Sequence, residues 1–195
     1  SAQLENAVQL YFDQRVSWGS SCQPRVFDMI DQRDDSVLYP YSAGLFGTGA
    51  NFAFKRSMFS EIGNFDEALG AGAPPGGGED LDIFVRTLLG GWKIVYEPGA
   101  IIGHVHRAEL DQLDKQMFNY GSGFSAFAAK YILNVKTGPA VLARVPRGLW
   151  RLRHVAKRVS ESPVLTPAIV AREFSGMFWG PWLYLKGKRW VRRTN

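Results

Sequence analysis

Several features are scarce in this chain of 195 residues, and each scarcity narrows what the protein can be. Cys22 is the only cysteine, which excludes an intrachain disulfide and is typical of a reducing compartment such as the cytosol. No uncharged apolar run reaches the roughly 18 residues that a membrane-spanning helix needs. The chain also lacks the C-x-x-C and H-E-x-x-H motifs of a self-contained zinc site, the Gly-Lys-Ser/Thr of a phosphate-binding loop and the G-x-S-x-G of a serine hydrolase.

Charge is distributed unevenly along the chain. Residues 1–143 hold 11 Lys/Arg against 16 Asp/Glu, whereas residues 144–195 hold 12 against 2. A basic tail of this kind predicts an anionic partner, either a lipid surface or a nucleic acid. Its aromatic residues suggest a hydrophobic face and not a platform for stacking bases, so we expect an anionic membrane surface bound through residues 141–195 and no nucleic acid. A tail packed on the body of the protein is the alternative.

Local patterns predict helices and strands separated by glycine-rich turns. Helical periodicity or start signals favour helices over residues 3–16, 57–62, 79–89, 110–120, 124–133 and 141–159. Runs rich in aromatic and β-branched residues favour strands over residues 51–54, 92–96 and 100–105. Residues 68–78 are almost all Ala, Gly and Pro, which predicts a mobile loop over a site. We expect two parts, a domain over residues 1–135 and a basic helical tail over residues 136–195.

The most informative segment is the glycine run at residues 76–78, which is followed directly by Glu79 and Asp80. Glycine lets the backbone approach a ligand closely, and carboxylates are favoured at a helix N-terminus. Adjacent residues diverge by about 100° around a helix, so one carboxylate can act as a general base while the other bonds a neighbouring group. A helix cap is the alternative interpretation of the pair. Asp82 is expected to be a solvated or capping residue.

Two histidines follow, on the strand predicted over residues 100–105 and just beyond it. His104 and His106 are two residues apart, so their side chains share one face of an extended chain. Two imidazoles on one face can bind a divalent metal ion. The alternative is that one of the two is a structural residue with a partner of its own.

The motifs form an ordered series over residues 38–123. In chain order they are L-Y-P-Y at 38–41, G-T-G-A-N-F-A-F-K-R at 47–56, I-G-N-F-D-E at 62–67, G-E-D-L-D at 78–82 with Arg86, G-W-K-I-V-Y-E-P at 91–98, H-V-H-R at 104–107, and Gln116 with Tyr120-Gly121. Each piece alone is a weak signal, but their order and spacing are specific. Taken together, they resemble the C-terminal, acceptor-side half of a family 2 glycosyltransferase with the GT-A fold.

The resemblance implies an α/β architecture, a partial GT-A fold, and transfer of a sugar from a nucleotide-sugar donor to an acceptor hydroxyl with inversion. Asp80 matches the position of the catalytic base, and Glu79 lies beside it. His104 matches the position of a ligand to Mn²⁺ or Mg²⁺, an ion that offsets charge on the departing diphosphate. Asp66 and Glu67 match positions that we expect to be structural. The substrate-binding positions that the resemblance implies are Gly49, Ala50, Asn51, His106 and Arg107.

The resemblance is incomplete on its N-terminal side. Family members carry an Asp-x-Asp motif at the end of an apolar strand, whereas Asp34-Asp35 lies in a polar stretch. We therefore expect part of a longer enzyme, inactive alone, that takes a glycan or lipid-linked acceptor in bacterial cell-envelope synthesis. Its expected location is cytoplasmic, peripheral at the inner face of the plasma membrane. A non-enzymatic peripheral membrane-binding module is the alternative function.

Overall fold

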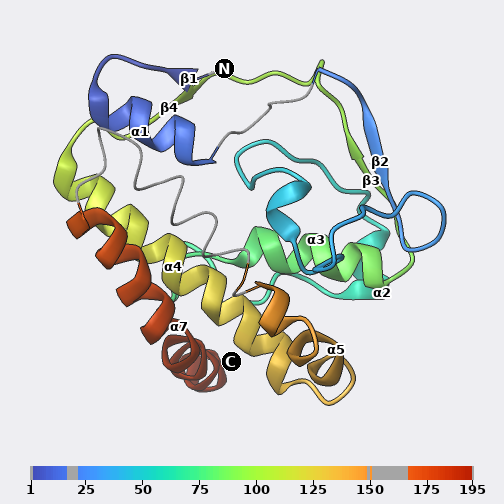
Figure 1. Cartoon of the computed structure of the whole chain (residues 1–195). Coiled ribbons are helices and arrows are strands. Elements are labelled where there is room, and N and C mark those ends of the chain that lie inside the picture. Colours follow the sequence, from blue (N-terminus) through green and yellow to red (C-terminus); the bar gives the residue numbers. More distant parts are fainter. Residues whose placement is uncertain (1, 17–21, 149, 151–166, 195) are drawn as a thin grey trace. The chain divides into compact units, whose positions relative to one another are not determined.

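The computed structural model describes residues 2–16, 22–148, 150 and 167–194 (Figure 1). The strands are β1 (Ala2–Gln3), β2 (Arg25–Phe27), β3 (Ile94–Tyr96) and β4 (His104–Val105). The helices are α1 (Ala7–Val16), α2 (Met58–Ile62), α3 (Glu79–Leu89), α4 (Leu110–Leu133), α5 (Gly138–Leu142) and α7 (Pro167–Thr194), with a 3-10 turn at Ala43–Leu45. None of the helices in these ranges is long and apolar enough to cross a bilayer.

The chain divides into two compact units. The first unit comprises Ser1–Phe65 and Glu79–Glu109, and the second comprises Asp66–Gly78 and Leu110–Asn195. This division does not follow the expected boundary at residue 135, because α4 and the 66–78 loop belong with α7.

Two small sheets organise the first unit. β1 pairs with β4 in parallel, with Ala2 opposite His104, and β2 pairs with β3 in antiparallel register, with Val26 opposite Val95. The strands predicted over residues 92–96 and 100–105 are therefore present in shortened form, as β3 and β4.

An aromatic cluster stands where a strand is predicted over residues 51–54. The ring centroids of Phe52 and Phe54 lie 4.9 Å apart, and they lie 6.1 and 6.3 Å from that of Phe84 on α3. Phe59 and Phe65 extend the cluster. Rings at these separations attract one another. The strand prediction is wrong: the backbone of residues 51–54 joins no sheet, and the phenylalanine rings pack on α3 and on one another.

The start of α1 is determined by its own side chains. The Gln9 N–H donates a hydrogen bond to Asn6 Oδ1 (3.0 Å), and the Glu5 N–H donates one to Gln9 Oε1 (2.6 Å). The first bond satisfies one of the donors that a helix N-terminus leaves without an intrahelical partner, and the second holds the residue before the cap. The helix predicted from residue 3 therefore begins at Ala7. Gln9 is buried, and its Nε2 donates to the backbone oxygen of His106 (3.0 Å), which ties α1 to the histidine segment.

In the second unit, α7 lies along α4 (Figure 1). The helices predicted over residues 110–120 and 124–133 form one helix, α4, which continues through Gly121 and Gly123. A Cβ atom on Gly121 would collide with the backbone oxygen of Glu173, and one on Gly176 with that of Phe118. Glycine in the interior of a helix lowers the stability of that helix, but here it permits the close approach of two helix backbones.

The tail is only partly described. The helix predicted over residues 141–159 overlaps α5, which begins earlier, at Gly138. Residues 149 and 151–159 of that prediction lie outside the described part of the chain.

The 66–78 loop is packed closely against α4, in contrast to the mobile loop that its composition predicts. Ser122 Oγ donates a hydrogen bond to the backbone oxygen of Pro75 (2.7 Å), and Pro75 is buried. A Cβ atom on Gly123 would lie 2.7 Å from the backbone carbon of Gly77. The small residues of this loop therefore allow its backbone to touch the helix.

Asp66 connects the loop to both helices. Its Oδ2 lies 2.9 Å from Lys130 Nζ and accepts a hydrogen bond from Tyr184 Oη (3.1 Å). Burial raises the pKa of the Asp66 carboxyl, but the hydrogen bonds from Lys130 and the Ala68 N–H and the charges of Lys130 and Lys188 together outweigh it, and the pKa lies below its ordinary value. These contacts agree with the structural role expected for Asp66.

Candidate functional site

Glu79 and Asp80 lie in the first turn of α3, which has the bounds predicted from the sequence. Gly78, the residue before the helix, has a φ of 93°, a conformation that residues with a side chain rarely adopt. Most of α3 is buried, including Ile83 and Leu88, and the buried residues surround the helix on nearly all sides. This burial holds α3 in place, and with it the acidic residues of its first turn.

Asp80 and Gly49 meet although they are 31 residues apart in the sequence. The Gly49 N–H donates a hydrogen bond to Asp80 Oδ2 (3.1 Å), and the Leu81 N–H donates one to Asp80 Oδ1 (2.8 Å). A Cβ atom on Gly49 would lie 3.3 Å from Asp80 Cβ and 3.4 Å from Phe52 Cε1, so position 49 has almost no room for a side chain. Asp80 is half-buried, and its two carboxylate oxygens retain lone pairs that can accept further hydrogen bonds.

The loop that carries Gly49 is fastened to the segment before β4. Asn51 Nδ2 donates a hydrogen bond to the backbone oxygen of Ala100 (2.6 Å), and the Asn51 N–H donates one to the backbone oxygen of Thr48 (3.3 Å). Gly49, Ala50 and Asn51 are all exposed. The structure thus brings three of the predicted substrate positions to the surface beside Asp80, and Asn51 links them to the segment that leads into His104.

The two histidines lie in different surroundings, although their ring centroids are 5.1 Å apart. His106 is buried, with its Nε2 3.2 Å from Asp13 Oδ1 and its ring in edge contact with Phe12. These contacts match the alternative in which one histidine is structural. His104 is half-buried, and burial lowers the pKa of its imidazole, with a further contribution from His106.

The described residues do not form a complete metal site. In residues 2–16, 22–148, 150 and 167–194, no group of three or more His, Cys, Asp or Glu side chains could hold a metal ion. His104 is nevertheless suited to be one ligand, because its lowered pKa favours the neutral imidazole that coordinates metals. Arg107, three residues further on, is exposed.

Asp82 differs most from its sequence-based interpretation. Its side chain is fully buried and accepts a hydrogen bond from Arg86 Nε at 2.8 Å. Arg86 Nη1 also donates to the backbone oxygens of Ile62 and Gly63, at 2.7 and 3.0 Å. The expectation of a solvated residue is therefore wrong, because Asp82 is buried and neutralises an arginine that binds the C-terminal end of α2. The four-residue spacing of Asp82 and Arg86 is the sequence signal that could have found this pair.

Comparison with known proteins adds one distant similarity. The chain is 28% identical over 142 residues to the pre-mycofactocin glycosyltransferase of Mycobacterium tuberculosis, both from strain CDC 1551 / Oshkosh and from strain ATCC 25618 / H37Rv. The match covers 72% of this chain but only 28% of each relative, so the chain spans little more than a quarter of their length. No family model and no solved structure matches the chain. The similarity supports a glycosyltransferase relationship at low identity.

Proposed function

We propose that this protein, within a longer polypeptide, transfers a sugar from a nucleotide-sugar donor to an acceptor hydroxyl. The observation that carries the proposal is the contact between Gly49 and Asp80, which places an exposed glycine-rich loop beside a carboxylate at a helix N-terminus. The distant similarity to a glycosyltransferase supports the same reaction class. The partial GT-A fold and the inverting stereochemistry are part of the proposal and come from the resemblance of the motifs.

Asp80 is the general base in this proposal. Its carboxylate takes the proton of the acceptor hydroxyl, and the acceptor oxygen forms a bond to the anomeric carbon of the donor sugar. The bond between that carbon and the diphosphate breaks, and the nucleoside diphosphate leaves with the electron pair. A base must lie within hydrogen-bond reach of the proton that it removes. The bonds from Gly49 and Leu81 hold the carboxylate in one orientation for this purpose.

The neighbouring residues bind and orient the substrates. Gly49, Ala50 and Asn51 contact the sugar or the acceptor through the exposed loop, and Arg107 offers a positive charge for an anionic group of a substrate. His104 would be the residue of this chain that holds Mn²⁺ or Mg²⁺, and the ion would supply positive charge that offsets the charge on the leaving group.

The biological setting is also part of the proposal. The acceptor is a glycan or a lipid-linked sugar of the bacterial cell envelope, and the reaction takes place at the cytoplasmic face of the plasma membrane. The basic composition of residues 144–195 supports a location beside anionic lipid.

The test measures nucleoside-diphosphate release from a panel of nucleotide sugars, with Mn²⁺ or Mg²⁺ and a membrane-lipid extract as acceptor. The 195-residue chain and the complete gene product that contains it are assayed side by side. Removal of a general base lowers the rate by about 10²–10⁴-fold. We therefore expect Asp80→Asn to lower release in this range in the active form, while donor binding measured by calorimetry is retained.

Asp111→Asn is the matched control, because Asp111 is an acid in the first turn of another helix, α4. It should leave the release rate unchanged. Glu79→Gln decides whether Glu79 shares the role of base. Equal release from wild type and Asp80→Asn contradicts the assignment of the base, and absence of release with every donor contradicts the proposed function.

A further inference from the structure

One face of α7 packs closely against α4, so the opposite face of α7 points away from α4. Gly176 and Gly180 allow backbone contact, since a Cβ atom on either would collide with backbone atoms of α4. Arg172 Nε bonds Asp114 Oδ2 at 2.9 Å and its guanidinium lies 4.8 Å from the centroid of the Phe118 ring. These contacts prevent α7 from turning its other face inward.

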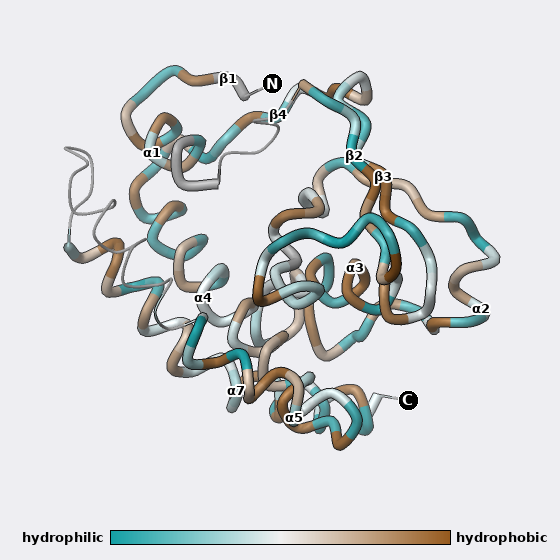
Figure 2. Tube along the Cα trace, turned by 45° about the vertical axis from the view of Figure 1, so that its right-hand side comes forward, coloured by the Kyte–Doolittle hydropathy of each residue, from teal (hydrophilic) through white to brown (hydrophobic). Residues whose placement is uncertain are grey.

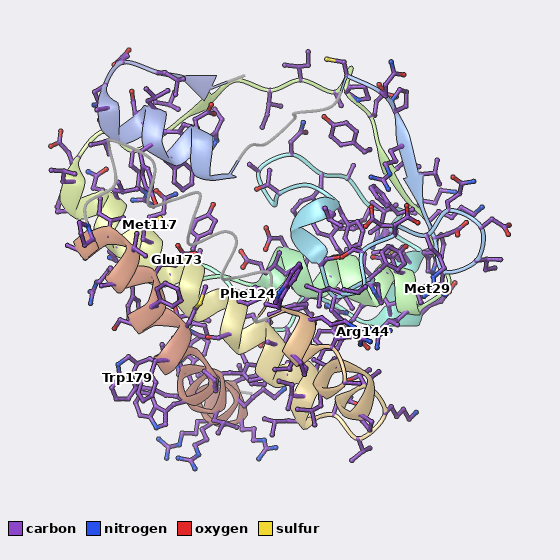
Figure 3. The ribbon with its side chains drawn as sticks, viewed as in Figure 1. Met29, Met117, Phe124, Arg144, Glu173 and Trp179 are labelled. Carbon is purple, nitrogen blue, oxygen red and sulfur yellow. The ribbon has the colours of Figure 1, made fainter. Side chains whose placement is uncertain are left out.

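The outward face of α7 is aromatic between Phe174 and Trp190. Figure 3 shows the labelled Trp179 directed away from α4, and hydrophobic and hydrophilic residues alternate along the helix in Figure 2. The side chains of Phe178 and Trp182 are 77% and 54% exposed. Residues 174–185 extend over about 18 Å of helix. The exposed large apolar side chains of α7, here called the aromatic face, are Phe174, Phe178, Trp179, Trp182, Leu185 and Trp190.

Basic residues follow the aromatic side chains on the same helix. Lys186 Nζ lies 5.5 Å from the centroid of the Trp182 ring, and the last turn of α7 contains Arg192 and Arg193. Lys186, Arg189, Arg192 and Arg193 are all exposed. The sole acidic residue in Pro167–Thr194 is Glu173. The exposed part of α7 therefore joins a large apolar surface to a dense positive charge.

We propose that the aromatic face and the exposed basic residues of α7 dock the protein on an anionic lipid bilayer, with the helix lying in the plane of the interface. Trp and Phe side chains are favoured at the level of the lipid headgroups, and Lys and Arg reach anionic headgroups through their flexible stems. A second protein surface would cover the aromatic side chains equally well, but a positive charge of this density specifically complements anionic lipid. This inference rests on the membrane location proposed above and assigns it to one face of α7, and it does not depend on sugar transfer.

The test is co-sedimentation of the 195-residue chain with phosphatidylcholine vesicles that contain 0% or about 30% phosphatidylglycerol, without donor or acceptor. We expect binding to the anionic vesicles that weakens as salt is raised. Each basic residue near an anionic surface strengthens partitioning by about fivefold. The double variant Arg192→Gln/Arg193→Gln should therefore weaken partitioning onto the anionic vesicles by about 25-fold. The control Lys115→Gln/Lys136→Gln, which removes two exposed charges outside α7, should change this partitioning little.

The aromatic contribution is tested separately. Phe178→Ser/Trp182→Ser should lower partitioning by at least about tenfold, because burial of apolar area is lost. Leu110→Ser/Phe124→Ser, which removes two exposed apolar side chains of α4, is the matched control. Circular dichroism establishes that each variant is folded. Absence of binding to anionic vesicles at low salt overturns the proposal, as does equal weakening by the control pairs. Self-association through α7, seen by light scattering without vesicle binding, overturns it in favour of a second copy as the partner.

Discussion

Removal of the buried carboxylate of Asp82 is the sharpest test of how α3 is supported. Asp82→Ala leaves the guanidinium of Arg86 without its anionic partner at a position where the Arg86 side chain is only 17% exposed. Arg86 would retain its hydrogen bonds to the backbone oxygens of Ile62 and Gly63. The α3 helix carries Asp80 in its first turn, so loosening it should also disturb the proposed base.

The loss of stability expected for Asp82→Ala follows from the burial of the ion pair. Breaking a buried ion pair by removing one partner costs about 3–5 kcal/mol, because the remaining charge stays desolvated. We expect a loss at the lower end of this range, near 3 kcal/mol, because Arg86 keeps its hydrogen bonds to two carbonyl oxygens and is partly exposed. Asp114→Ala is a matched comparison, since Asp114 Oδ2 and Arg172 Nε are 2.9 Å apart, close to the 2.8 Å between Asp82 and Arg86, but both side chains are 45% exposed. An exposed pair of this kind contributes about 0–1 kcal/mol.

Native-state hydrogen exchange is the appropriate assay, because it reports the opening free energy of α3 and α4 separately. We expect Asp82→Ala to lower the opening free energy of the α3 amides by about 3 kcal/mol. Asp114→Ala should change that of the α4 amides by less than about 1 kcal/mol. Equal losses in the two variants would refute the reasoning, because burial would then not decide the strength of the pair.

Three further predictions concern packing and protonation. Gly176→Ala should cost about 1–3 kcal/mol in urea unfolding, because its Cβ would collide with the backbone oxygen of Phe118, whereas Gly103→Ala, with no atom within 4 Å, should change stability by less than about 0.5 kcal/mol. The NMR signal of the His104 C2 proton should titrate with a midpoint below pH 6.5, because burial lowers the pKa of the imidazole. Since the folded-state pKa is lowered, this residue's contribution to stability falls as the pH drops from 6.5 toward that midpoint. A midpoint above 6.5 would contradict its burial. The Asp28 carboxyl should titrate with a pKa of about 2, because backbone N–H groups donate hydrogen bonds to it. The stability that Asp28 contributes to the folded protein is present above about pH 4 and is lost as the pH falls toward 2. An NMR midpoint near pH 4 would disprove this.

Features governed by neighbours in the sequence could be predicted from the sequence. The bounds of α3 were predicted correctly because a glycine run, acidic residues in the first turn and a terminal glycine pair all act within a few residues. The short strands β3 and β4 were found for the same reason, with boundaries too long by two and four residues. The meeting of Gly49 with Asp80 was implied only by the resemblance of the ordered motifs, since no local signal joins residues 31 positions apart.

The sequence by itself determined the local helix signals, the basic tail and the types of chemical group that the candidate site contains. Tertiary structure decided which of those groups are buried and which are exposed. The buried Asp82 pairs with Arg86, which also binds the end of α2. The buried His106 packs against Phe12 of α1 and has Asp13 as its partner. The free energy of a charge or of a glycine depends on the atoms packed around it, and those atoms come from residues far away in the chain.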